Sequence, residues 1–151
     1  MTGVPRVVAI HVAPGTRLPM TSVDRVEAEA GKGLVGDRYH GTRHRHVSVQ
    51  SATALAEAAE IFGAPIDPAG TRRNVTVSHG DVPRTPGERL RLGDVLLEVV
   101  RVAAPCKLLD DTLGRGAQEA LRRRGGSIFR VLEGGEIRLG AAVVTAPTPA
   151  D

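Results

Sequence analysis

The sequence predicts a mostly β fold of the α+β class, in which a strongly bent sheet or partly closed barrel carries about two helices. Short stretches rich in Val, Leu and Ile recur along the 151 residues, separated by turn signals. The regular alternation of strands and helices that a doubly wound fold requires is absent. Aromatic residues make up only 2% of the chain, so the core must be built from aliphatic side chains.

Three strands and a loop are predicted in the first third of the chain. Residues 4–12 are β-branched and predict a strand, and residues 22–30 predict another. The glycine-punctuated loop GKGLVGDRYHG follows at 31–41. The sequence HVSVQ at 46–50 returns to alternation and predicts the next strand.

The first predicted helix covers residues 51–63. Ser51 or Thr53 can cap its start, and Gly63 can end it. Two prolines within 65–68 keep the next stretch out of helix.

The C-terminal half predicts short strands around a second helix. Residues 73–77 predict a strand, and residues 88–106 predict a hairpin whose turn lies at Gly93–Asp94. Residues 115–124 predict a helix that stops at two glycines. The remaining segments, up to about residue 146, alternate strand and turn signals.

Length and composition suit one domain over residues 1–151, with a core at about 7–144 and a loose tail at 146–151. No apolar run reaches the ~18–20 residues that cross a bilayer. A single cysteine cannot form an internal disulfide, so we expect a cytoplasmic protein. The net charge of +3 does not indicate a nucleic-acid binder, since one Tyr, two Phe and no Trp offer few platforms for base stacking.

The densest polar stretch is the loop at 36–46, with three arginines and three histidines. These side chains could form a cationic rim or could simply face water. Asp37 with His40, His44 and His46 invites a metal site, but the spacing matches no zinc pattern in which two ligands share a helical face or a turn. The preceding glycines lack the P-loop pattern.

Two further arginine clusters follow. The stretch 71–74, Thr-Arg-Arg-Asn, stands at the entry to a strand. Arginine forks recognise phosphate, and an Asn amide can donate and accept toward a heterocycle, although a charged strand entry needs no ligand. The run 122–124 ends the predicted helix, where cations favour the helix dipole, and we expect no binding function there.

The single cysteine, Cys106, lies in VAAPCKLLDD. A free cysteine most often packs as a small hydrophobic residue, so this stretch alone does not predict a function for it. Nearby cations such as Lys107 would favour the reactive thiolate.

The order of these motifs resembles the MOSC domain, named for the C-terminal domain of molybdenum cofactor sulfurase. The resemblance runs from about Val7 to Val144, and it is specific because Gly-Asp-Arg-Tyr, Arg-Arg-Asn and Pro-Cys occur in that order. The resemblance implies a β-rich, barrel-like fold that binds the molybdenum cofactor, a pterin with a dithiolene and a phosphate. It implies that Cys106 ligates the metal or carries sulfur, because a thiolate is a soft donor suited to both.

The same resemblance implies which residues hold the cofactor. Arginines of the loop and of the strand entry are expected at the phosphate. The full expected set is Lys32, Asp37, Arg38, Arg45, Arg72, Arg73 and Asn74.

Three functions remain open from the sequence. The first is a cofactor-binding protein that, if it is an enzyme, reduces N-hydroxylated compounds with electrons from a partner protein. The second is a non-catalytic carrier of sulfur or cofactor in cofactor maturation, supplied by a cysteine desulfurase. The third, a basic nucleic-acid-associated domain, is the least favoured. Whether the protein is an enzyme is not decided by the sequence.

Overall fold

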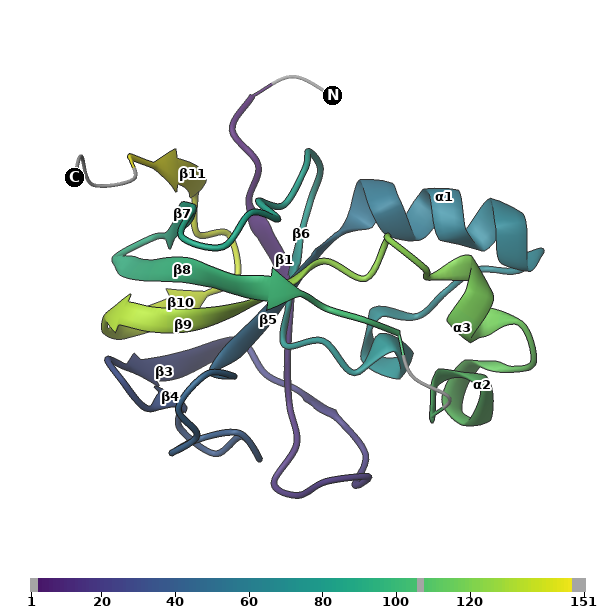
Figure 1. Ribbon diagram of the computed structural model, residues 1–151, viewed down its shortest axis with the longest axis horizontal. Coiled ribbons are helices and arrows are strands. Elements are labelled where there is room, and N and C mark those ends of the chain that lie inside the picture. The colour runs from purple at the N-terminus through teal and green to yellow at the C-terminus, as the bar shows by residue number, and fades with distance from the viewer. Residues whose placement is uncertain (1–2, 106–107, 148–151) are drawn as a thin grey trace.

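Two open sheets form most of the regular structure (Figure 1). The computed structural model describes residues 3–105 and 108–147. Over these residues, one sheet has eight strands in the order β11-β7-β8-β9-β5-β6-β1-β2, and the other has three in the order β10-β3-β4. The predicted mostly β fold with a bent, incompletely closed sheet is confirmed.

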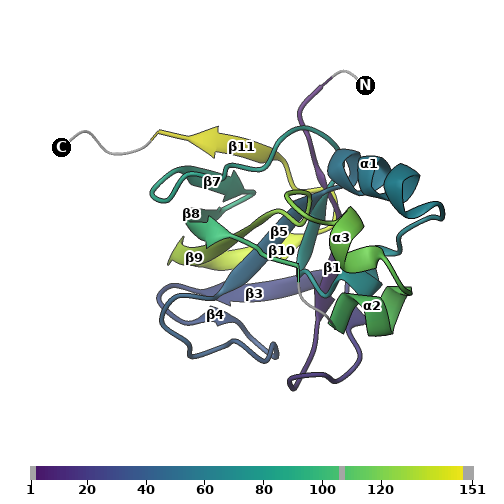
Figure 2. The same cartoon turned by 45° about the vertical axis from the view of Figure 1, so that its right-hand side comes forward.

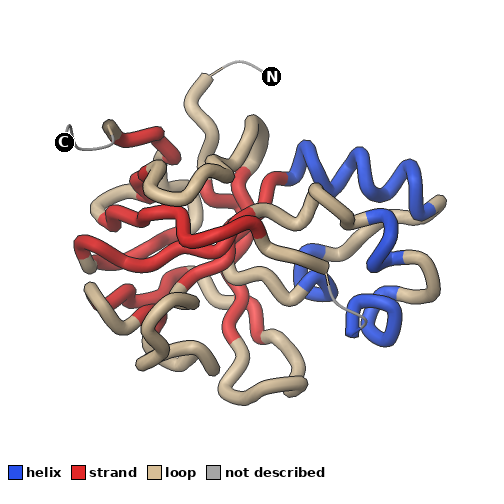
Figure 3. Tube along the Cα trace, in the orientation of Figure 1, coloured by secondary structure: helices blue, strands red, loops and turns tan. Residues whose placement is uncertain are grey.

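The larger sheet contains β1 (Val7–Val12), β2 (Thr21–Ser22), β5 (Val47–Ser51), β6 (Val75–Val77), β7 (Arg89–Leu92), β8 (Val95–Val102), β9 (Ser127–Glu133) and β11 (Val143–Ala146). The smaller sheet contains β3 (Arg25–Glu29), β4 (Gly33–Leu34) and β10 (Gly135–Arg138). The helices are α1 (Ala52–Phe62), α2 (Leu108–Leu113) and α3 (Ala117–Ala120), with a 3₁₀ turn, η1 (Pro68–Thr71). The helices gather on one side of the molecule, and most of the strands, with long loops between them, lie on the other (Figures 2 and 3).

An aliphatic core joins the two sheets. In β3 the alternating side chains of Val26 and Ala28 are buried, and Ile137 of β10 is fully buried beside them. Phe129 of β9 is the largest fully buried side chain among the described residues. The pairing of β8 with β9 shifts register twice, and such irregularities bend a sheet around its core.

Helix α1 confirms the sequence prediction closely. The hydroxyl of Ser51 accepts from the N–H of Thr53 at 3.2 Å, which caps the start. Gly63 adopts φ 86°, so its N–H reaches the carbonyl of Ala59 at 2.8 Å and ends the helix. Strands β5 and β6 pair in parallel. Parallel neighbours cannot be joined by a tight turn, and α1 lies in the long connection that they need.

The second helical region differs from the prediction over 115–124. Helix α3 stops at Ala120, and Arg123 takes a left-handed φ of 64° that no helix continues through. Helix α2 was not predicted, since its sequence LLDDTL contains three weak helix formers. It is held by packing, with Leu109 buried in a small cluster under α1. None of the described helices is long and apolar enough to cross a membrane.

Other local differences arise from caps and bends. The segment predicted as one strand at 22–30 divides into β2 and β3, which belong to different sheets. Pro68 does not exclude a helical turn, because it occupies the start of η1, where proline is tolerated, and Asp67 caps it.

Candidate functional site

A cavity of about 80 Å³ forms where the loop after β1, the loop at 36–46 and the η1–β6 junction meet. Its lining is Thr16, Arg17, Arg38, Tyr39, Arg45, Thr71, Arg72, Arg73, Leu108 and Leu109. Five of these residues are arginines, and no carboxylate is among the described residues that line it. We call this the arginine cavity. Four of the arginines were expected from the sequence: Arg38, Arg45, Arg72 and Arg73.

Arg38 is fixed by the residue before it. Its Nη1 donates to Oδ1 of Asp37 at 3.1 Å, and its Nη2 donates to the carbonyl of Arg72 at 3.2 Å. The Asp37 carboxylate, whose side chain is fully buried, also accepts from the N–H groups of Ala13 and Tyr39. Asp37 therefore holds the loop and aims Arg38, while remaining outside the cavity lining.

Tyr39 supports two of the arginines. The guanidinium carbons of Arg38 and Arg45 lie 4.5 and 4.2 Å from the centroid of its ring. Such contacts stabilise a cation and restrict its orientation. The ring thus keeps two positive charges at the same wall of the cavity.

Arg72 sits at a strained turn. It ends η1 with a left-handed φ of 64°, and its Nη1 donates to the carbonyl of Leu18 at 2.8 Å. Arg17 lines the same cavity and has φ 67°. Non-glycine residues in this conformation persist only where the surroundings impose it, and they cluster at functional sites.

Arg73 connects the cavity to the segment before residue 106. Its Nε donates to the carbonyl of Gly125 at 3.0 Å, and its Nη2 donates to the carbonyl of Ala104 at 3.2 Å. The residue is only 6% exposed. Much of its hydrogen-bonding capacity therefore orders the protein itself.

Asn74 is expected at the cofactor, but it does not line the arginine cavity. Its Oδ1 accepts from the N–H and hydroxyl of Ser48, and its Nδ2 donates to the carbonyl of His11. These contacts tie β5, β6 and β1 together beside the cavity. Lys32 is exposed and also lies outside the cavity lining.

Cys106, with Lys107, lies outside the described residues. Its sequence neighbours on either side do line cavities: Leu108 and Leu109 contribute to the arginine cavity. Ala104 and Pro105 contribute to a second cavity of about 450 Å³. We call this the flanking cavity, and its wall also includes Asp110 and Gln118.

The histidines of the loop have other partners. His46 is buried, its Nδ1 accepts from the N–H of Val131, and its Nε2 faces the carbonyl of Thr42 at 2.7 Å. His40 pairs with Glu29 at 2.6 Å. Among the described residues, no group of three or more His, Cys, Asp or Glu side chains is arranged to hold a metal ion.

The arginine cavity is suited to an anion. Clustered guanidinium groups repel one another, and a phosphate relieves that repulsion while accepting several N–H donors. The volume accommodates a phosphate-sized group but is well below the roughly 300–1,000 Å³ of sites for whole organic ligands. The sequence does not predict Arg17, because a single cation in a Pro- and Gly-rich loop forms no pattern. Tyr39 enters the sequence analysis only as part of the Gly-Asp-Arg-Tyr motif.

The model of the MOSC domain matches residues 36–144. The fold is similar to that of the YuaD protein from Bacillus subtilis, with a TM-score of 0.80 and 18% identity over 93% of this chain and 94% of that one. It is also similar to YiiM from Geobacillus stearothermophilus, with a TM-score of 0.75 and 20% identity over 95% of this chain and 75% of that one.

YiiM from Escherichia coli matches with a TM-score of 0.70 and 17% identity, over 97% of this chain and 72% of that one. No match was found among curated proteins. At these identities the structural comparisons establish the fold.

Proposed function

The chain belongs to the MOSC domain family, and on that premise we propose that it binds a molybdenum cofactor, with the phosphate in the arginine cavity. The observation that carries the proposal is the set of five arginines around one phosphate-sized space. Two residues that follow Cys106 in the sequence, Leu108 and Leu109, line the same space. A phosphate bound there would place the cofactor next to the segment that contains the thiol.

The donor set fits the phosphate end of such a cofactor. Arg38 and Arg45 are held by Tyr39, and Arg72 is held by the carbonyl of Leu18, so these cations are oriented before any anion binds. Preorganised charges lose little entropy on binding. The arginine cavity is too small for the pterin, and the flanking cavity, at about 450 Å³, has the size of an organic ligand site.

The chemistry follows from the cofactor and the thiol together. When bound, the cofactor supplies a metal centre that changes oxidation state. Cys106 would contribute a soft thiolate to that metal. We propose that the substrate is an N-hydroxylated compound: two electrons from a partner protein and two protons cleave its N–O bond, giving an amine and water.

The chain's own residues have supporting tasks. Asp37 aims Arg38 at the cavity, and Arg73 holds the carbonyl of Ala104, two residues before the thiol. Asp110, on the wall of the flanking cavity, accepts from the N–H of Gln118 at 2.8 Å and fixes that wall.

The test is the molybdenum and pterin content of protein purified from a molybdenum-replete host. Wild-type protein should carry both, Arg45→Gln should lose both, and Cys106→Ser should lower the molybdenum content and abolish N-hydroxyl reduction. Arg115→Gln, an exposed arginine outside the arginine cavity lining, is the matched control. Wild-type protein without pterin, or equal contents in all four proteins, would overturn the proposal.

A carrier of sulfur is the second candidate, favoured by the position of a lone cysteine in the family motif. It predicts a persulfide on Cys106 after incubation with a cysteine desulfurase, seen as one added sulfur atom by mass spectrometry. Persulfide formation without turnover of N-hydroxylated compounds would favour the carrier.

A further inference from the structure

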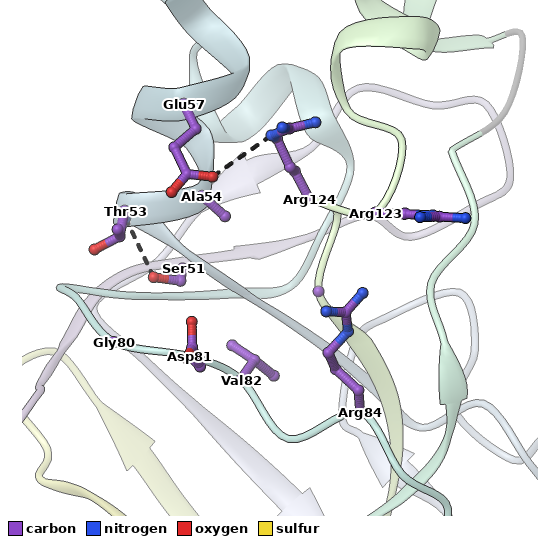
Figure 4. Close-up of a pocket in the computed structure, with 11 residues that line it drawn as sticks. Ser51, Thr53, Ala54, Glu57, Gly80, Asp81, Val82, Arg84, Arg123 and Arg124 are labelled. Carbon is purple, nitrogen blue, oxygen red and sulfur yellow. Dashed lines mark hydrogen bonds and ion pairs between the residues drawn. The ribbon is translucent and has the colours of Figure 1, made fainter.

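A third cavity, of about 260 Å³, lies at the start of α1 and shares no lining residue with the arginine cavity (Figure 4). Residues near the end of β6, the turn before β9 and the first turn of α1 form its walls. The charged residues in its lining are Glu57, Asp81, Arg84, Arg123 and Arg124. Three arginines from two separate segments therefore line one space. In Figure 4 the side chain of Arg123 extends away from Ser51 and Asp81.

Two of these arginines have no partner within the described part of the chain. Arg124 pairs with Glu57 across 3.6 Å, which balances one positive charge against one negative charge. The side chains of Arg84 and Arg123 form no hydrogen bond or ion pair with any described residue, and both residues are exposed. Figure 4 shows Arg84 extending from its loop on the side opposite the Arg124–Glu57 pair.

The backbone of Arg123 supplies an independent observation. Over the described residues, the non-glycine residues with positive φ are Arg17, Arg72 and Arg123. The first two line the arginine cavity, and Arg123 lines both this cavity and the flanking cavity. Since such conformations cluster at binding sites, the strained turn agrees with a site here.

We propose that this cavity binds the phosphate group of a small molecule, held by Arg84 and Arg123. Guanidinium forks match the oxygens of phosphate and carboxylate groups, and two arginines at one cavity suit the higher charge of a phosphate. The N–H of Thr53 at the start of α1 already donates to Ser51, and the proposal relies on the arginines as donors. Val82 and Ala54 form an apolar wall beside them, which leaves room for an organic group attached to the phosphate.

Asp81 sets the charge of the site. Its carboxylate lines the cavity without a hydrogen bond to any described residue. With Arg124 neutralised by Glu57, the remaining charge is two arginines against one aspartate. Asp81 therefore weakens the binding of a fully ionised phosphate and favours a ligand with a donor of its own.

The test follows backbone amide shifts by NMR during titration with inorganic phosphate and, separately, with a nucleoside monophosphate. We expect shifts at 51–54 and 80–84, and a dissociation constant at least about fivefold weaker in Arg84→Gln and in Arg123→Gln. Asp81→Asn should bind inorganic phosphate more tightly. Arg115→Gln, outside this cavity, should match the wild type, and Arg45→Gln should leave these shifts intact.

The outcomes are distinct. Shifts confined to 38–45 and 71–73, or affinities that Arg84→Gln and Arg123→Gln leave unchanged, would overturn the proposal while leaving the arginine cavity in place. Binding of both ligands at 51–54 and 80–84 supports it, and tighter binding of the nucleoside monophosphate identifies a phosphomonoester as the source of the phosphate. If Arg84→Gln and Arg123→Gln keep the melting temperature of the wild type, any loss of binding is local to the cavity.

Discussion

The guanidinium of Arg73 donates to the carbonyl of Ala104 at 3.2 Å, and so joins the entry of β6 to the segment that precedes residue 106. Its Nε donates at 3.0 Å to Gly125, across the turn before β9. One buried arginine thus fixes the relative positions of three segments that are distant in the sequence. The arginine read from the sequence as a phosphate ligand is also a structural residue.

Replacing Arg73 with Met should destabilise the protein. The change leaves two backbone carbonyls without a donor, at a cost of about 1–3 kcal/mol for each group that stays unsatisfied. Urea unfolding of Arg73→Met beside Arg115→Met measures the difference, because Arg115 is exposed. Equal stability of the two variants would show that the contacts to Ala104 and Gly125 contribute little.

Replacing Asn74 with Ala should cost about 2–4 kcal/mol, because Ser48 loses an acceptor and His11 loses a donor in a buried region. Gln50→Met is the matched control. Gln50 donates to Thr76, but its Oε1 has no hydrogen-bond partner among the described residues, so its removal should cost about 1 kcal/mol or less. A larger loss in Gln50→Met than in Asn74→Ala would contradict this ranking.

Elements that depend on local sequence signals were predicted better than elements that depend on long-range packing. The Ser51 and Gly63 caps of α1 are local signals, and the structure confirms both. Helix α2 depends on the burial of Leu109 against distant residues, and no local pattern carries that contact. Where the helix propensity of a segment is weak, tertiary packing determines whether the helix forms.

The candidate site shows the same difference between what local sequence predicts and what long-range contacts decide. Arg38, Arg45, Arg72 and Arg73 were predicted, and they do converge on one cavity. Asp37 and Asn74 do not line it, and their side chains form hydrogen bonds with the protein's own backbone. The sequence alone does not show whether a polar side chain binds a ligand or the backbone. The cavity at Arg84 escaped prediction because its arginines lie about forty residues apart in the chain.

Glycine is required at position 126. A Cβ there would stand 1.8 Å from the carbonyl oxygen of Val49, and φ is +79°. Gly126→Ala should therefore cost about 3 kcal/mol or more, because a backbone clash adds to an unfavourable conformation. Gly87→Ala isolates the conformational part, since φ is +94° there with no atom within 4 Å, and should cost about 1–2 kcal/mol. Thermal unfolding of the pair would contradict the clash if both melted together.

Stability should fall as the pH drops below 6.5, in part through His46. Burial lowers the pKa of His46 from 6.5, against the opposing effect of the Thr42 carbonyl, and the charge of Arg130 lowers it further. The neutral ring is required because Nδ1 accepts from the N–H of Val131. The unfolded chain takes up the proton near pH 6.5 and the folded protein resists it, so the contribution is complete above 6.5 and is lost as the pH falls.

Urea unfolding between pH 8 and pH 5 measures this effect. The slope attributable to one histidine is at most about 1.4 kcal/mol per pH unit. Burial also lowers the pKa of His11, so His46→Gln should reduce the slope without removing it. The same slope in the variant and the wild type would show that His46 does not contribute.

The ring of Tyr39 should matter to anion binding through Arg38 and Arg45. Their guanidinium carbons lie 4.5 and 4.2 Å from the ring centroid, and in this half-buried setting each contact stabilises its cation by at least about 0.5–1 kcal/mol. Tyr39→Ala removes both contacts, frees the two side chains and should weaken phosphate binding at 38–45 by roughly tenfold, the equivalent of 1.4 kcal/mol. Tyr39→Phe keeps the ring and should bind within about twofold of the wild type. If Tyr39→Phe lost as much affinity as Tyr39→Ala, the hydroxyl rather than the ring would be the contact that matters.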